Sequence, residues 1–215
     1  MSTKHEVICQ IEDLENCLST DVQLNLPRLI TVCGTFKQSC DKDLSIRCLA
    51  SKSGAYPTLL KALEKTSSIQ ESMDSLSSVL EAMASFFSGN PDLLDDRGTD
   101  VLLNVFRLPH CRPINALLLE VVHHCCQKHE NNRQRFVERG LVPLVAEALL
   151  SQSRERSIVI KTCSVYSILT IDDDVRVMFG KGSEYAKLIV CETDALSTLL
   201  CLATGTPCTL LSICL

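Results

Sequence analysis

Histidine and cysteine, two side chains that bind zinc readily, gather in the stretch HHCCQKH at residues 123–129. On a helix, Cys125 and His129 would share one face. His123 and Cys126 would share another. No Cys-x-x-Cys pair and no second pair of ligands at zinc spacing accompanies them, and a motif without its context is weak support for a metal site. We therefore expect no metal and no other cofactor: a cysteine here fills the core, and the histidines lie at the surface or are hydrogen-bonded.

Three consecutive aspartates, at residues 172–174, could hold Ca²⁺ or Mg²⁺ through their carboxylate oxygens. They lack the alternate spacing and the distal glutamate of a calcium loop. We instead expect Asp174 or a neighbour to cap a helix that begins near Val175, where acidic groups also suit the helix dipole. The nearby stretch FGKGS, at residues 179–183, has neither the spacing nor the preceding strand of a phosphate loop.

Arginines and glutamates recur at helical spacing within residues 130–138, in the sequence ENNRQRFVE. Ion pairs along this helix are expected among Glu130, Arg133, Arg135 and Glu138. Such pairs on an exposed helix contribute only a few tenths of a kcal/mol. We interpret them as structural.

No pair of residues places a nucleophile beside a base at a readable spacing: neither G-x-S-x-G nor H-E-x-x-H occurs. The net charge of −5 does not suit nucleic acid or anionic lipid, which attract basic surfaces. The thirteen cysteines are an odd number, and the N-terminal sequence MSTKHEVICQ has no apolar stretch like that of a signal peptide, so we expect free, mostly buried thiols in a reducing compartment. The sequence predicts a cytosolic protein that is not an enzyme and binds neither nucleic acid nor membrane.

One uncharged stretch, Ala195–Leu215, is about long enough to cross a bilayer. Gly205 and Pro207 interrupt it, and serine and threonine are frequent. It leaves open an alternative function, that of a membrane-tethered adaptor with a C-terminal anchor.

The elements that position all these residues are marked by a recurring corner, a glycine followed three residues later by proline or valine. The corners are Gly54 with Pro57, Gly98 with Val101, and Gly140 with Pro143. Glycine permits the turn that ends one helix, and proline suits the first turn of the next. The glycines are 44 and 42 residues apart, a period typical of three-helix armadillo repeats.

Between the corners lie longer amphipathic stretches, which predict a third helix in each repeat, at residues 77–87, 115–126 and 158–169. A looser fourth copy has Asp194 in the glycine position. N-terminal to the repeats, apolar residues at helical spacing predict one helix, and Pro27 opens another. Each unit must stack on its neighbours to bury its apolar face. A bundle of antiparallel helices is the alternative.

Several segments resemble the armadillo repeat-containing protein 6 family, in its order and spacing. They are GAYPTLL (54–60), NPDLLDDRG (90–98), KHENNRQRFVERGLVPLV (128–145), DDDVRVMFG (172–180) and AKLIV (186–190). Members of the family continue with further repeats, whereas this chain ends in TGTPCTLLSICL. The resemblance therefore suggests a C-terminally truncated form.

The resemblance implies a way of binding partners. Armadillo arrays hold extended peptides along their third helices, and peptide-carrying members use a ladder of Trp and Asn at i and i+4. The corresponding positions here are Glu81, Ser85, Glu120, His124, Ser164 and Ile168. The chain has no Trp and these positions hold no Asn, so we do not expect it to carry nuclear-localisation peptides in this way. Glu81 and Glu120 favour a basic partner segment; the alternative is that they are only solvated.

Together these observations predict an all-α fold, a right-handed armadillo superhelix of three-helix repeats. Residues 1–40 would form N-terminal helices that make a partial capping repeat, residues 41–203 the armadillo repeats, and residues 204–215 a divergent, disordered tail. The predicted function is a scaffold that binds other proteins in the cytosol and in the nucleus. The sequence identifies neither the partner nor the oligomeric state.

Overall fold

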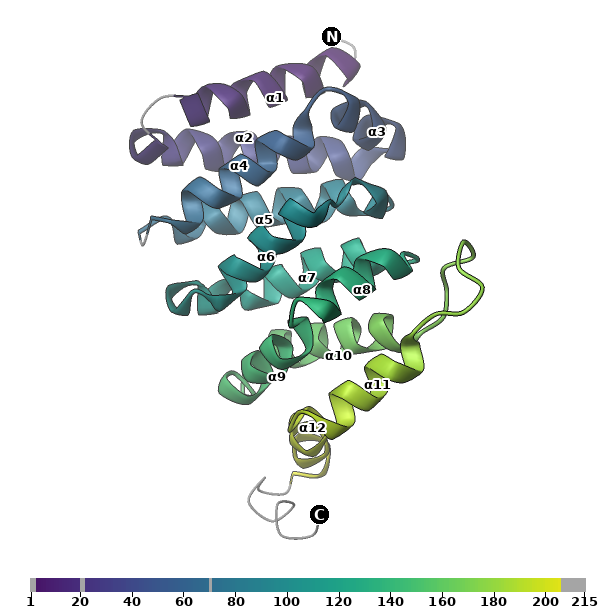
Figure 1. Cartoon of the computed structure of the whole chain (residues 1–215). Coiled ribbons are helices and arrows are strands. Elements are labelled where there is room, and N and C mark those ends of the chain that lie inside the picture. The colour runs from purple at the N-terminus through teal and green to yellow at the C-terminus, as the bar shows by residue number, and fades with distance from the viewer. Residues whose placement is uncertain (1–2, 20–21, 70, 206–215) are drawn as a thin grey trace. The chain divides into compact units, whose positions relative to one another are not determined.

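The regular elements of the computed structural model are all helical over the residues it describes, 3–19, 22–69 and 71–205 (Figure 1). The chain divides into two compact units, Met1–Cys125 and Cys126–Leu215. Both consist of helices joined by turns and loops, an arrangement consistent with armadillo-type helical repeats.

The first unit consists of two long helices followed by shorter ones. They are α1 (Thr3–Ser19), α2 (Val22–Lys42), α3 (Leu44–Lys52), α4 (Ala55–Ser67), α5 (Met73–Phe87), the 3₁₀ turn η1 (Pro91–Leu93), α6 (Asp96–Arg107), the 3₁₀ turn η2 (Pro109–Ile114) and α7 (Asn115–Cys126). Helix α2 packs chiefly against α5 and α1. Aromatic rings fix the α2–α5 contact, since the ring centroids of Phe36 and Phe86 lie 6.1 Å apart.

The second unit has helices of nine to fifteen residues. They are α8 (Glu130–Glu138), α9 (Leu141–Ser151), α10 (Arg156–Thr170), α11 (Gly182–Cys191) and α12 (Ala195–Thr204). The three long helices expected from the sequence are present as α5, α7 and α10. A loop at residues 171–181 joins α10 to α11, and Figure 1 shows it projecting from the helices.

Two of the three predicted corners are confirmed. Gly54 precedes α4 with φ 86°, and Gly140 precedes α9 with φ 88°. This left-handed conformation costs an L-residue about 1 kcal/mol or more and costs glycine nothing. Pro57 and Pro143 each lie in the first turn that follows, where backbone N–H groups have no helical partner to lose.

The corner predicted at Gly98 is wrong. Gly98 lies inside the first turn of α6, and the helix is capped earlier by Asp95, whose carboxylate accepts a hydrogen bond from the Gly98 N–H at 2.7 Å. Glycine is needed there for space: a Cβ atom would overlap the Tyr56 hydroxyl and press on Leu94.

The helix predicted to open at Pro27 begins earlier, at Val22. Pro27 therefore lies within α2, where it removes one backbone donor. The tertiary contacts of α2 with α1 and α5 outweigh this local penalty. From the sequence alone, the proline is expected to mark the start of the helix.

The described cysteines are unpaired by disulfides and mostly buried. Burial raises the pKa of the Cys33 and Cys40 thiols to about 12, so these side chains behave as small hydrophobes.

Within the stretch considered as a membrane anchor, helix α12 ends at Thr204, and Gly205 follows in a left-handed conformation with φ 68°. None of the helices in the described ranges combines the length and the apolar character needed to cross a membrane. Most of the predicted tail, residues 206–215, lies outside the residues that the structure describes.

Candidate partner-binding site

A pocket of about 410 Å³ opens on the first unit. It is lined by three helices, α2, α5 and α7, which contribute Lys37, Asp41, Glu81, Ala84, Ser85, Leu117, Glu120 and His124, together with Ser88 at the end of α5. Four of the six residues predicted to bind a partner, those on α5 and α7, thus lie in one cavity.

The lining follows from helical spacing. Glu81 and Ser85 are four residues apart on α5, and Glu120 and His124 are four residues apart on α7, so each pair lies on one face of its helix. On the opposite face of α5, side chains such as Val79 are completely buried in the core. Because the apolar face of α5 is buried in the core, its polar face is turned toward the pocket.

The other two predicted residues lie in the second unit, on α10. Ser164 is half-buried, and its hydroxyl donates to the carbonyl of Ile160 at 3.0 Å. Ile168 is buried, with 8% of its surface exposed. The structure therefore brings neither of them into the pocket on the first unit.

Two residues of the pocket, Lys37 and Asp41 on α2, were missed by the sequence analysis. They are also four residues apart, and Lys37 lies 44 residues before Glu81. That separation is one repeat period, so the same spacing applied to the N-terminal helices predicts Lys37 and Asp41 as ladder positions.

The pocket is acidic. Lys37 Nζ donates to Glu81 Oε2 at 3.0 Å. The pKa of Lys37 is raised, first by this hydrogen bond, against the opposing effect of burial, and then by the negative charges of Glu81, Asp41 and Glu120. Three carboxylates therefore face one ammonium group, which leaves the pocket with a negative charge.

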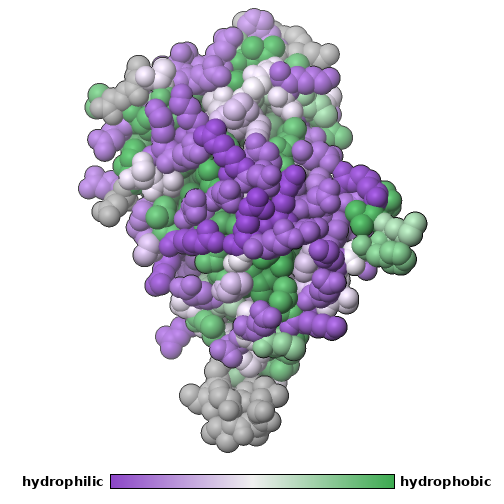
Figure 2. Space-filling model, viewed as in Figure 1, coloured by the Kyte–Doolittle hydropathy of each residue, from purple (hydrophilic) through white to green (hydrophobic). Residues whose placement is uncertain are grey.

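Elsewhere on the first unit, polar side chains cover the face turned to the viewer in Figure 2 over α4 and α6. Arg97 on α6 donates to both carboxylate oxygens of Glu64 on α4, at 2.9 Å each. An exposed pair of this kind contributes about 1 kcal/mol or less. We assign it to the packing of the two helices and not to a site.

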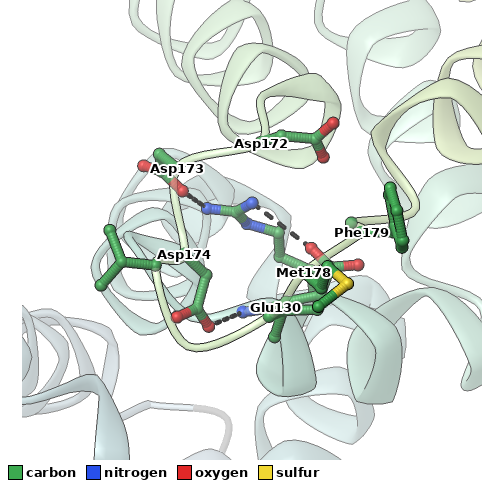
Figure 3. A pocket seen from close by; sticks show the side chains of 10 residues that line it. Glu130, Asp172, Asp173, Asp174, Met178 and Phe179 are labelled. Carbon is green, nitrogen blue, oxygen red and sulfur yellow. Dashed lines mark hydrogen bonds and ion pairs between the residues drawn. The ribbon is translucent and has the colours of Figure 1, made fainter.

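A second pocket, of about 320 Å³, lies in the second unit beneath the loop at residues 171–181 (Figure 3). Its floor is Arg133 on α8, which is completely buried. The guanidinium group donates to the carbonyls of Cys126 and Ile171 at 3.0 and 2.6 Å. It also forms ion pairs with the carboxylates of Glu130 and Asp173. The ion pair predicted along the helix between Arg133 and Glu130 is present, but both of its side chains are buried. The second pair, with Asp173, joins the helix to the loop.

Asp174 does not cap a helix beginning near Val175, because residues 171–181 form no helix. Its carboxylate instead accepts a hydrogen bond from the Glu130 N–H at 2.8 Å, and so caps α8 from 44 residues away. Hydrogen bonds from Arg176, chiefly that of its side chain, hold the pKa of Asp174 well below its usual range, against burial and together with the Glu130 N–H. The predicted cap of a helix near Val175 is therefore wrong, and the helix that Asp174 caps was not predicted.

Glu130 closes the other end of the loop. Its Oε1 accepts hydrogen bonds from the Lys181 N–H and from the Tyr185 hydroxyl, both at 3.0 Å. Burial, followed by the charge of Glu130, raises the pKa of Tyr185. The polar groups of this cluster thus bind one another, and we assign the cluster to holding the loop in place.

The loop itself presents apolar side chains to solvent. Val175, Met178 and Phe179 are 99, 88 and 83% exposed. Figure 2 shows the hydrophobic surface at the projecting loop.

The HHCCQKH stretch does not form a ligand set. Cys125 and Cys126 are completely buried, as predicted for core cysteines, and burial raises the pKa of Cys126. His129 caps α8, since its Nδ1 accepts a hydrogen bond from the Asn132 N–H at 3.2 Å. Across the described residues, no three His, Cys, Asp or Glu side chains are grouped so as to hold a metal ion.

No family model matches the sequence. The chain is 29% identical over 197 residues to "Armadillo repeat-containing protein 6" of Pongo abelii and of Homo sapiens, and each alignment covers 91% of this chain and 38% of the relative. It is 33% identical over 166 residues to the "Armadillo repeat-containing protein 6 homolog" of Drosophila melanogaster, covering 76% of this chain and 35% of the relative. The chain thus spans a little over a third of the length of the curated relatives it matches.

Proposed function

Because this chain is a homologue of armadillo repeat-containing protein 6, we propose that it is a non-catalytic scaffold that binds a basic, extended segment of a partner protein along α2, α5 and α7. The proposal includes a right-handed superhelix of the repeats and a location in the cytosol and in the nucleus.

The pocket on the first unit carries the proposal. Helices α2, α5 and α7 each contribute a pair of residues at i and i+4 to its lining, which is the spacing at which armadillo helices meet a peptide. The residues on α5 and α7 are the ladder positions that the resemblance to armadillo proteins implies. The ladder positions and the cavity therefore both indicate this surface as the place where a partner binds.

The chemistry of the lining favours a cationic segment. Asp41, Glu81 and Glu120 provide carboxylates for lysine or arginine, and Ala84 and Leu117 provide apolar wall for the methylene part of such side chains. The chain has no Trp to stack on a peptide, so we expect charge to contribute more than stacking.

The test measures binding of a fluorescent, lysine- and arginine-rich peptide by anisotropy. Reversing the charge of both Glu81 and Glu120 to Lys should weaken binding by about tenfold or more, since each close charge pair contributes up to about 1 kcal/mol. The control is the double variant Glu12→Lys with Glu71→Lys, which changes the net charge equally at two exposed residues outside the pocket.

An acidic peptide of the same length serves as the second probe. The proposal expects binding of the basic peptide only, with an affinity that falls as salt is raised. Equal binding of both peptides, or an equal loss in the pocket variant and the control, would refute it.

A further inference from the structure

One lining residue of the pocket has the charge that the proposed ligand would have. Among the nine residues of the lining, all of them described, Lys37 is the only lysine or arginine. Its ammonium group is held by Glu81 and is influenced by the charges of Asp41 and Glu120. The pocket therefore already binds a primary ammonium group, one that belongs to the chain itself.

We propose that Lys37 is an internal competitor: it occupies the cation position beside Glu81 and leaves when a lysine or arginine side chain of a partner enters the pocket. This inference rests on the proposed function and adds its regulation. The ligand is a basic side chain, and Lys37 sets how tightly it is held.

The geometry makes Lys37 displaceable. The side chains of Lys37 and Glu81 are 39 and 44% exposed, so neither is locked by packing. A half-exposed ion pair between flexible side chains contributes little to stability. Lys37 can therefore turn to water on its four-carbon stem, which frees the Glu81 carboxylate to pair with the incoming group.

The direction of the effect distinguishes a competitor from a contact residue. If Lys37 contributed only to the fold of the pocket, removing it would leave peptide affinity unchanged or lower it. As a competitor, its removal frees Glu81 and raises the affinity. Lys37→Met keeps the length of the apolar stem without the charge.

The experiment uses the basic peptide at near-physiological salt. Lys37→Met should bind it about three- to fivefold more tightly than the original chain, the size of effect expected from releasing one partly exposed ion pair. Lys61→Met, at an exposed residue of α4 outside the pocket, removes the same charge and should change affinity by less than about 1.5-fold because salt screens it. Lys37→Arg should bind like the original chain.

A double variant links the effect to Glu81. In a Glu81→Gln background, Lys37→Met should raise affinity by less than about 1.5-fold, since the competition is for that carboxylate. Lys37→Gln repeats the test if Lys37→Met melts at a lower temperature than the original chain.

The outcomes separate this inference from the proposed function. If the basic peptide binds and binding depends on Glu81 and Glu120, but Lys37→Met behaves like Lys61→Met, the competitor role is overturned and the proposed function of the pocket stands. If the peptide binds no variant above the acidic control, both are overturned.

Discussion

Replacing Arg133 with methionine removes the side chain that joins α8 to the loop at residues 171–181. Methionine fills much of the same space without charge or donors. The change deprives the carbonyls of Cys126 and Ile171 of a hydrogen-bond donor. It also leaves the buried carboxylate of Glu130 without its ion-pair partner.

The size of the loss follows from the burial of these groups. Removing one partner of a buried ion pair destabilises a protein by about 3–5 kcal/mol. Two features place this case near the lower end of that range. The Asp173 side chain is 22% exposed and can turn to water, and Glu130 retains the hydrogen bonds from Lys181 and Tyr185. We therefore expect Arg133→Met to cost about 3 kcal/mol.

Two measurements check this expectation. Urea denaturation followed by circular dichroism gives the free energy of unfolding, and the loss should fall on the transition of the second unit if the two units unfold separately. Limited trypsin digestion reports on the loop, because Arg176 and Lys181 lie within it. Cleavage there should be faster in the variant than in the original chain.

The control is Arg154→Met, at an exposed arginine of the same unit, which should change stability by less than about 0.5 kcal/mol. If Arg133→Met also stayed within that range, with unchanged cleavage at the loop, the assignment of Arg133 as the group that anchors the loop would be refuted.

Two further predictions concern the corners and the cap. The new methyl group of Gly54→Ala meets no atom within 4 Å, so this variant should cost only the left-handed backbone strain, about 1 kcal/mol. Gly98→Ala must displace Tyr56 and should cost more. In thermal melts Gly98→Ala should therefore have the lower melting temperature, whereas Gly54→Ala would have it if Gly98 were the corner. The pKa of Asp174 is lowered in the folded chain, so its contribution to stability is full above its ordinary value of 3.8 and is lost as pH falls through the lower folded value. Acid titration of stability should therefore be steeper at low pH in the original chain than in Asp174→Asn, and identical slopes would contradict the assigned cap.

Local features of the sequence predicted the helices and two of their corners. Gly54 and Gly140 were found because a left-handed residue before a proline leaves a local signal. Gly98, followed by Val101 in place of proline, gave only the glycine part of this signal and for another reason, since a close approach of Tyr56 also requires a residue without a side chain. Sequence alone does not distinguish the two causes.

The candidate site was predictable to the extent that it repeats. Glu81 and Glu120 are ladder positions that the resemblance to armadillo proteins implies, and Lys37 lies one period of 44 residues before Glu81. The ion pair between Lys37 and Glu81 joins residues 44 apart, and only folding shows that the ammonium faces the carboxylate.

The sequence by itself determined the helical character and the polar face of each long helix, because these depend on the spacing of residues within a few turns. The tertiary structure alone decided which partners the buried charged side chains bind. Arg133 lies 40 residues before Asp173, and Asp174 caps a helix that begins 44 residues earlier. A buried charge is stable only beside its partners, and chain folding, not local spacing, brings those partners together.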